Sequence, residues 1–107
     1  TYVFDIDGTI CSKTDGDYTQ AKPFYDRIKQ VNHLYDEGHT IIFLTARGMG
    51  RHNNNFVDAR RDFYDLTATQ LRQWDVKYHQ LFLGKPSGDY YIDDKGVNDE
   101  DFFNTRN

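Results

Sequence analysis

The sequence predicts an α/β fold with an open, doubly wound and mostly parallel β-sheet. Apolar strand-like runs alternate with helix-like segments along the chain, and polar residues collect where the strand-like runs end. A third observation is the continuous apolar run Thr40–Leu44, which is typical of a strand buried on both faces of a parallel sheet. The length of 107 residues fits a single domain over residues 1–107, with one hydrophobic core.

The first strand and the first helix are expected in the N-terminal third. Thr1–Asp7 is β-branched and aromatic and breaks at Gly8, which predicts a strand that runs into acidic residues. Thr9–Gln20 is polar and is expected to be a loop. A helix is expected to open at Pro23, which suits a first turn, and to stop at Gly38. Its apolar residues recur at helical spacing: Phe24, Ile28, Val31 and Tyr35.

The middle of the chain predicts a strand, a loop and a second helix. After the strand Thr40–Leu44, the polar stretch Ala46–Asn55 is expected to be a loop, and Phe56–Phe63 is either helix or ordered loop. Thr67–Gln70 matches a capping box and predicts a helix over about Thr67–Trp74. Two residues flank the box at the positions of a hydrophobic staple: Leu66 and Leu71.

Two further strands and a last helical turn are expected near the C-terminus. Gln80–Leu83 is a short third strand that ends at Gly84-Lys85-Pro86. Asp89–Ile92 is expected to be a fourth strand that ends at two carboxylates. Asn98 is expected to cap a final helical turn that carries Phe102 and Phe103.

The composition excludes several classes of partner. Thirteen Lys and Arg against 17 Asp and Glu give a net charge of −4, which argues against a nucleic-acid-binding protein. No apolar run approaches the roughly 20 residues of a membrane span. The single cysteine, Cys11, cannot form an internal disulfide, which fits a reducing compartment. We therefore expect a cytoplasmic protein with neither a nucleic-acid nor a membrane partner.

Chemistry-bearing side chains follow the predicted strands, where ligands of open α/β sheets bind. They are two pairs of carboxylates, one hydroxyl and one ammonium: Asp5 and Asp7, Asp93 and Asp94, Thr45, and Lys85. Packing gives no reason to gather four carboxylates at one rim, because unpaired carboxylates repel one another. A hard divalent cation with oxygen ligands resolves this repulsion, and Mg²⁺ is the common choice.

The same rim is expected to bind an anion. Lys85 can neutralise a phosphate oxygen, and the Thr45 hydroxyl can donate to another. The backbone N–H groups of Gly8 and Thr9 are expected to form an anion-binding turn. Arg47 follows Ala46 in the same loop and either reaches a substrate phosphate or lies on the surface.

These residues resemble the haloacid dehalogenase superfamily of phosphohydrolases. Asp5-Ile6-Asp7-Gly8-Thr9 matches its Asp-x-Asp-Gly-Thr signature, Leu44-Thr45-Ala46-Arg47 resembles its second motif, Lys85 its third, and Ile92-Asp93-Asp94 its fourth. The resemblance implies a three-layer doubly wound domain in which Asp5 attacks phosphorus and Asp7 acts as acid and then base. It also implies Mg²⁺ held by the Asp5 carboxylate, the Asp7 backbone carbonyl and Asp94, with Asp93 acting through water or by orienting Lys85.

The stretch Gly84-Lys85-Pro86-Ser87, together with Asp89–Lys95, is similar to small, capless members associated with capsular polysaccharide biosynthesis. Ile10–Ala21 and Ala46–Gly84, where larger relatives carry cap domains, are too short or too occupied to hold one. The open site implies either a large phosphorylated substrate, such as a glycan, or a second subunit of a homo-oligomer that covers it. Two alternatives to a phosphatase stay open: a phospho-accepting switch like the receiver domains, and a non-catalytic regulatory domain.

Overall fold

The computed structural model of the chain describes residues 1–105. In chain order its elements are β1 (Tyr2–Phe4), the 3₁₀ turn η1 (Tyr18–Gln20), α1 (Tyr25–Asp36), β2 (Ile41–Thr45), α2 (Phe56–Gln73), β3 (Gln80–Leu83) and α3 (Asp99–Thr105). None of the helices in these residues is long and apolar enough to cross a bilayer.

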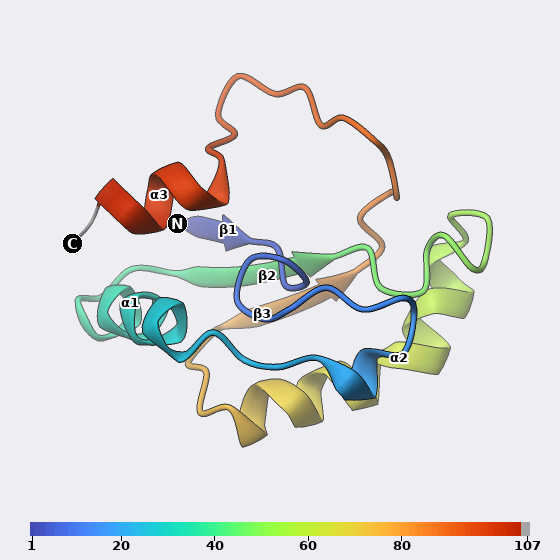
Figure 1. Cartoon of the computed structure of the whole chain (residues 1–107), viewed down its shortest axis with the longest axis horizontal. Helices are drawn as coiled ribbons and strands as arrows, with labels where there is room; N and C mark the ends of the chain where they lie inside the picture. The colour runs from blue at the N-terminus through green and yellow to red at the C-terminus, as the bar shows by residue number, and fades with distance from the viewer. Residues whose placement is uncertain (106–107) are drawn as a thin grey trace.

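The three strands form one parallel sheet in the order β1-β2-β3 (Figure 1). Phe43 of β2 lies between Phe4 of β1 and Leu81 of β3 in register. Helices α1 and α2 each connect neighbouring strands, and both connections run across the sheet in the same direction. Because such connections share one hand, the two helices pack on the same face. The result is an α/β fold of Rossmann-like form.

The core lies on this helix-covered face. Strand residues Phe4, Phe43 and Leu81 are buried there, with Ile28 of α1 and Leu71 of α2 among the side chains that pack with them. α1 forms around a stripe of apolar residues three apart, and it ends before Gly38, whose φ of +98° suits glycine.

The opposite face of the sheet stays partly open. Val3 is 58% exposed and Phe82 is 48% exposed, while Ile42 and Leu44 are partly buried. In residues 1–105 the sheet and its helices therefore form two layers, and the third layer expected of a doubly wound domain is not formed. The cause is the strand order, because no strand follows on the other side of β1 to carry a helix back across the sheet.

α2 is longer than the sequence pattern predicts. It starts at Phe56, with the Asn55 side chain accepting hydrogen bonds from the N–H groups of Val57 and Asp58. The prediction of a helix start at Thr67 is wrong, because Thr67 lies inside this helix. Its hydroxyl contacts another buried group instead of capping the backbone.

The predicted fourth strand, Asp89–Ile92, is not formed. The segment Gly84–Asn98, which we call the arm, contains no helix or strand and arcs away from the sheet (Figure 1). A parallel strand beside β1 would need a crossover of about a dozen residues, and only Gly84–Gly88 separate β3 from Asp89. The prediction therefore fails on the length of the connection.

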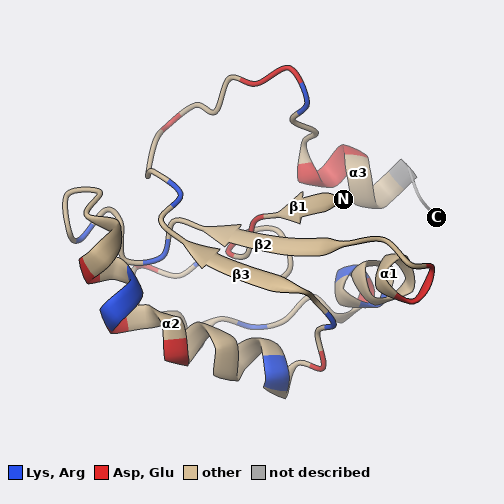
Figure 2. Ribbon diagram, turned by 180° about the vertical axis from the view of Figure 1, so that it is seen from behind, with Lys and Arg blue, Asp and Glu red and all other residues tan. Residues whose placement is uncertain are grey.

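α3 follows the arm and lies along β1, at the edge of the sheet away from β3 (Figures 1 and 2). The side chain of Asn98 accepts a hydrogen bond from the Glu100 N–H, which confirms the predicted cap. Phe103 is buried and stacks on Phe4, and the Arg27 guanidinium of α1 lies 4.8 Å from the centre of its ring.

Candidate active site

An open pocket of about 230 Å³ lies where β1 and β2 end. Two carboxylates, two cations, two hydroxyl-bearing threonines, a tyrosine and an alanine line it: Asp5, Asp7, Lys13, Arg47, Thr14, Thr45, Tyr18 and Ala46. The pocket therefore brings together five of the residues that the sequence singled out: Asp5, Asp7, Thr45, Ala46 and Arg47.

Asp5 is the first residue after β1 and is partly buried in the pocket wall. Burial raises the pKa of its carboxyl above the usual value, although the nearby Lys85 ammonium and the Ile6 N–H favour the carboxylate. The Lys85 Nζ lies 3.8 Å from Asp5 Oδ2, at the far limit of an ion pair. Asp5 is thus a poorly compensated carboxylate that a bound cation would stabilise.

Asp7 is held by a two-pronged ion pair with Arg47. Arg47 Nε donates to Asp7 Oδ2 at 2.9 Å, and Nη2 donates to Asp7 Oδ1 at 2.9 Å. The Cys11 thiol also donates to Oδ1, at 3.5 Å. Both oxygens of this carboxylate are therefore engaged, and its position is fixed by the fork of the guanidinium.

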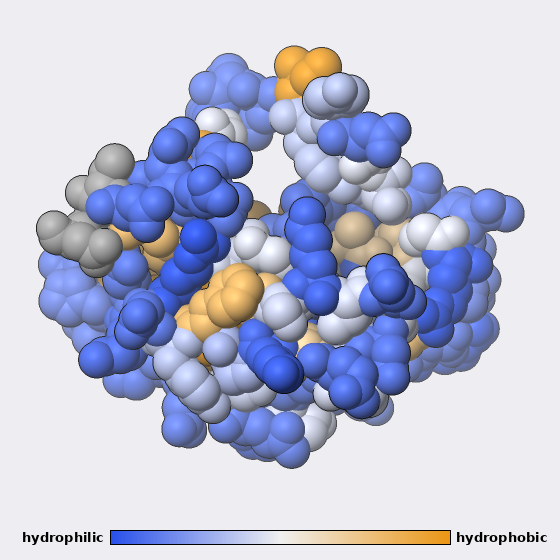
Figure 3. All heavy atoms as spheres, in the orientation of Figure 1, coloured by the Kyte–Doolittle hydropathy of each residue, from blue (hydrophilic) through white to orange (hydrophobic). Residues whose placement is uncertain are grey.

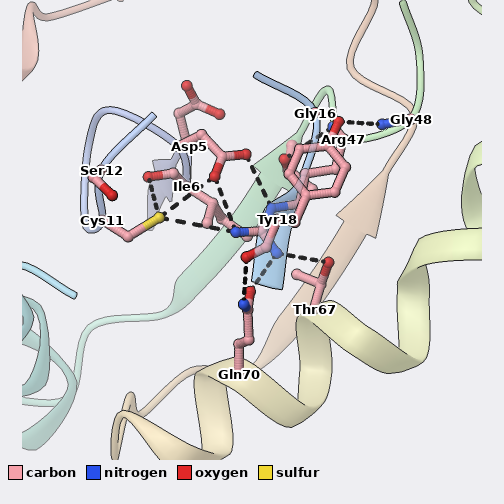
Figure 4. A network of polar contacts seen from close by, with 12 residues as sticks. Asp5, Ile6, Cys11, Ser12, Gly16, Tyr18, Arg47, Gly48, Thr67 and Gln70 are labelled. Atoms are coloured by element: carbon pink, nitrogen blue, oxygen red, sulfur yellow. Dashed lines mark hydrogen bonds and ion pairs between the residues drawn. The ribbon is translucent and has the colours of Figure 1, made fainter. Parts of the chain in front are cut away.

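Arg47 itself is 1% exposed, so it is not a surface arginine, and although it lines the pocket its guanidinium donates to protein groups. Its Nη1 donates to the side-chain oxygens of Thr67 and Gln70 on α2, and its guanidinium lies 4.8 Å from the centre of the Tyr18 ring. Gln70 in turn donates to the Tyr18 backbone carbonyl. These contacts satisfy a buried charge and tie α2 to the pocket (Figure 4).

Thr45 connects the end of β2 to Lys85. Its backbone carbonyl accepts hydrogen bonds from the N–H groups of Gly84 and Lys85, both at 3.2 Å. Its buried hydroxyl accepts the Arg47 N–H at 3.2 Å and still has a proton to donate into the pocket. The parallel pairing of β2 with β3 thus carries Lys85 to the same rim as Asp5.

Gly8 and Thr9 form a tight turn rather than an anion-binding nest. Gly8 has a φ of +82°, which favours glycine, and its N–H donates to the Cys11 carbonyl at 2.8 Å. The Thr9 N–H donates to the Ile6 carbonyl at 3.0 Å. The turn uses both N–H groups itself, so neither is available to an anion in this conformation, and substrate binding by Gly8 and Thr9 stays a prediction.

Asp93 and Asp94 lie on the arm, outside the pocket, and both are exposed. Figure 2 shows acidic residues on the arm, well separated from those after β1. The Lys95 backbone N–H donates to Asp93, which lowers the pKa of that carboxyl. Within one chain, the structure does not bring the second carboxylate pair to the first, because the strand expected to carry it is absent.

Sequence reasoning missed Lys13, Thr14, Tyr18 and the contact of Cys11 with Asp7. The backbone of the loop after Gly8 is held near the pocket by two isolated β-bridges, in which Cys11 pairs with Asp7 and with Pro23. Burial and the Asp7 charge raise the pKa of Cys11 to about 12. Only a polar loop composition marks this stretch in the sequence, and composition does not give the path of a loop.

The donor set fits a magnesium ion held through few protein ligands. In residues 1–105 no group of three or more His, Cys, Asp or Glu side chains could hold a metal. Mg²⁺ in proteins is commonly bound by one or two carboxylates and completed by water and substrate oxygens. Asp5, with its carboxylate poorly compensated, and the buried Thr14 hydroxyl, which has no hydrogen-bond partner, are oxygens that such an ion and its waters would satisfy.

No protein-family model and no curated protein matches the chain. The crystal structure of an MCSG target from Vibrio cholerae is similar to it, with a TM-score of 0.87 and 28% sequence identity. The match covers 95% of this chain and 85% of that one. Its description names no activity, so the likeness supports the α/β fold and leaves the chemistry to the pocket.

Proposed function

We propose that the chain is a phosphatase that hydrolyses a phosphomonoester through a phosphoryl group carried on Asp5. One observation carries the proposal: Asp5 and Asp7 line one open pocket with the Thr45 hydroxyl, and the Lys85 ammonium lies 3.8 Å from Asp5. A nucleophilic carboxylate, a second carboxylate for proton transfer, a hydroxyl donor and a cation are the set that phosphoryl transfer uses.

In the first step an Asp5 carboxylate oxygen attacks phosphorus, and the bond to the leaving oxygen breaks. Lys85 and the Thr45 hydroxyl stabilise the negative charge on the phosphoryl oxygens. Asp7 delivers the proton that the leaving oxygen takes up, which requires that Asp7 is protonated when the substrate binds and that one of its oxygens turns from Arg47 or Cys11 toward the pocket.

In the second step water attacks the Asp5-bound phosphoryl group and frees phosphate. Asp7 accepts the proton of this water, and Arg47 holds Asp7 in place while it does so. Mg²⁺ held by the Asp5 carboxylate and the Asp7 backbone carbonyl would neutralise phosphoryl charge during both steps.

The resemblance to the haloacid dehalogenase superfamily supports the same chemistry and suggests a HAD-type, capless domain. It also suggests the substrate class, a sugar phosphate of polysaccharide biosynthesis. The pocket is open, which suits a phosphate at the end of a larger molecule.

The test is hydrolysis of a generic aryl phosphate with Mg²⁺ present. Asp5→Asn removes the nucleophile and should lower kcat by at least about a thousand-fold. Asp36→Asn, a change on the exposed end of α1, is the matched control and should leave kcat unchanged. Equal activity of the Asp5 variant and the wild type would refute the assignment of the nucleophile.

A phospho-accepting switch is the second candidate, and the Arg47 fork favours it. If Asp7 stays locked in its ion pair, no base activates water and the phosphoryl group persists on Asp5. Burst labelling followed by continued phosphate release supports the phosphatase. Stoichiometric labelling without release supports the switch.

A further inference from the structure

The arm holds strand-forming side chains in solvent. Ile92 is 97% exposed and Tyr90 is 87% exposed, while Tyr91 and Val97 are each more than half exposed. The space-filling view shows an opening between the arm and the rest of the molecule (Figure 3). Because burial of apolar surface stabilises folded chains, such exposure marks a segment without its packing partner.

β1 offers the matching surface. In residues 1–105 it pairs only with β2, so its outer edge carries no strand, and open edges are templates for an added strand. The arm repeats the pattern of β1, since Asp93 follows Ile92 as Asp5 follows Phe4. In a parallel pair with the two acidic ends aligned, Ile92 lies beside Phe4 on the helix-covered face.

The arm of a chain cannot reach its own β1 in this orientation. From Leu83 at the end of β3 to the start of such a strand, the path crosses three strand spacings, roughly 14 Å, and returns five residues, about 16 Å, along the strands. The straight line is about 22 Å, and a route over the side chains of one face is longer. Gly84–Gly88 supply six Cα–Cα steps from Leu83 to Asp89, at most about 22 Å when fully extended, so the segment is too short for any route around the side chains.

The position of α3 favours the parallel direction. Asp99, its first residue, pairs with Arg27, which also donates to the Thr9 carbonyl in the turn just after β1. α3 therefore begins at the edge of the sheet where Asp5 lies. A parallel strand Asp89–Ile92 arrives at this same edge, whereas an antiparallel strand would leave Asp93 at the opposite one.

We propose that two copies of the chain exchange residues Asp89–Thr105. In each copy, Asp89–Ile92 of the other forms the fourth parallel strand on the outer edge of β1. The α3 of the other copy packs against β1 and α1 in the position that α3 occupies here. Gly84–Gly88 is the segment that passes from one copy to the other. An exchange of identical elements needs no new surface, because each contact of α3 already exists within one chain.

The exchange completes the pocket, and this consequence rests on the proposed function. Each pocket then takes Asp5, Asp7 and Lys85 from one chain and Asp93 with Asp94 from the other. The acids on the arm become the second carboxylate pair beside the first, and neither chain is a complete enzyme alone.

Covalent trapping tests the exchange without reference to activity. Aligned ends place Tyr91 beside Val3, and these side chains are 55% and 58% exposed. The double variant Val3→Cys/Tyr91→Cys should yield a covalent dimer under mild oxidation, seen on a non-reducing gel. The control Val3→Cys/Val57→Cys, with Val57 59% exposed on α2, should stay monomeric. A double variant that stays monomeric, with or without an internal disulfide, would overturn the proposal.

Mixing of two inactive variants tests the shared pocket. Asp5→Asn chains refolded together with Asp93→Asn/Asp94→Asn chains form mixed dimers in which one of the two pockets is intact. Because random pairing makes half of the dimers mixed, activity should return to about a quarter of the wild-type value. No recovery contradicts the shared pocket. A different outcome is a Val3→Cys/Tyr91→Cys chain that forms the covalent dimer, together with a wild-type chain that hydrolyses no phosphomonoester. That outcome would support the exchange and refute the phosphatase.

Discussion

The ion pair between Arg47 and Asp7 should dominate the stability of the pocket, and Arg47→Met tests this. The substitution keeps an unbranched apolar stem, which reaches about as far as the Arg47 Nε, and removes the rest of the guanidinium. It leaves the Asp7 carboxylate, the Thr67 hydroxyl and the Gln70 amide oxygen without their donor. Breaking a buried pair by removing one partner costs about 3–5 kcal/mol. We expect the lower end, about 3 kcal/mol, because the Asp7 side chain is 22% exposed and can gain water.

The assay is thermal unfolding followed by circular dichroism. A loss of 3 kcal/mol lowers Tm by about 12–24 °C in a domain of this size. Arg47→Lys keeps the charge and loses the fork, so it should cost about half as much and remain folded for measurement. Arg61→Met is the control, because Arg61 pairs with Asp58 and Asp62 on the exposed face of α2 and its loss should leave Tm unchanged.

A double-mutant cycle with Asp7→Asn isolates the pair itself. The two changes should be non-additive by about 1–3 kcal/mol, because each removes the same interaction. The reasoning fails if the free energy of unfolding of Arg47→Met is within about 1 kcal/mol of the wild-type value, or if the two changes are additive in the cycle. Either result would mean that the Arg47 guanidinium does not hold Asp7.

Three further predictions concern the backbone at Gly48, the Cys11 thiol and the Asp5 carboxyl. Gly48→Ala should lower the free energy of unfolding in urea more than Gly38→Ala does. Both glycines have a positive φ, but a Cβ at Gly48 would lie 2.5 Å from the Phe63 ring, whereas a Cβ at Gly38 would meet nothing. Equal losses would contradict the packing at Gly48. Cys11, whose thiol has its pKa raised to about 12 by burial and Asp7, should resist a thiol reagent at pH 8 until the chain unfolds, and rapid labelling of the native protein would count against this environment. Asp5→Asn should raise Tm at pH 7. Because the pKa of Asp5 is raised in the folded protein, its charge opposes folding above that pKa and has no effect below the ordinary value of 3.8. An increase in Tm that is the same at pH 3 would have another cause.

Local sequence signals predicted the elements that local chemistry determines. β3 has the predicted bounds, and β2 and α1 lie within a residue or two of them, because an apolar run, a helical stripe and a glycine stop act over a few residues. The start of α2 was missed because Thr67–Gln70 mimics a capping box. Inside the helix, Thr67 and Gln70 accept hydrogen bonds from Arg47 instead. These contacts join residues about twenty positions apart in the sequence.

The site was predictable only where strands place it. Asp5, Asp7 and Thr45 meet because parallel strands end at one edge, and that follows from the element order. The burial of Arg47 was not predictable, because a charged residue in a polar loop is usually exposed. The position of Asp93 was misjudged because a strand-like composition says nothing about whether the preceding connection can reach the sheet.

Trapping of the phosphorylated residue tests the central claim most directly. The wild-type protein is mixed with a radiolabelled phosphomonoester and Mg²⁺, quenched in acid within the first turnover, and mapped by peptide. We predict label on Asp5 that forms before free phosphate appears and decays as phosphate is released. Hydrolysis without any labelled protein, or label on another residue, would contradict the account.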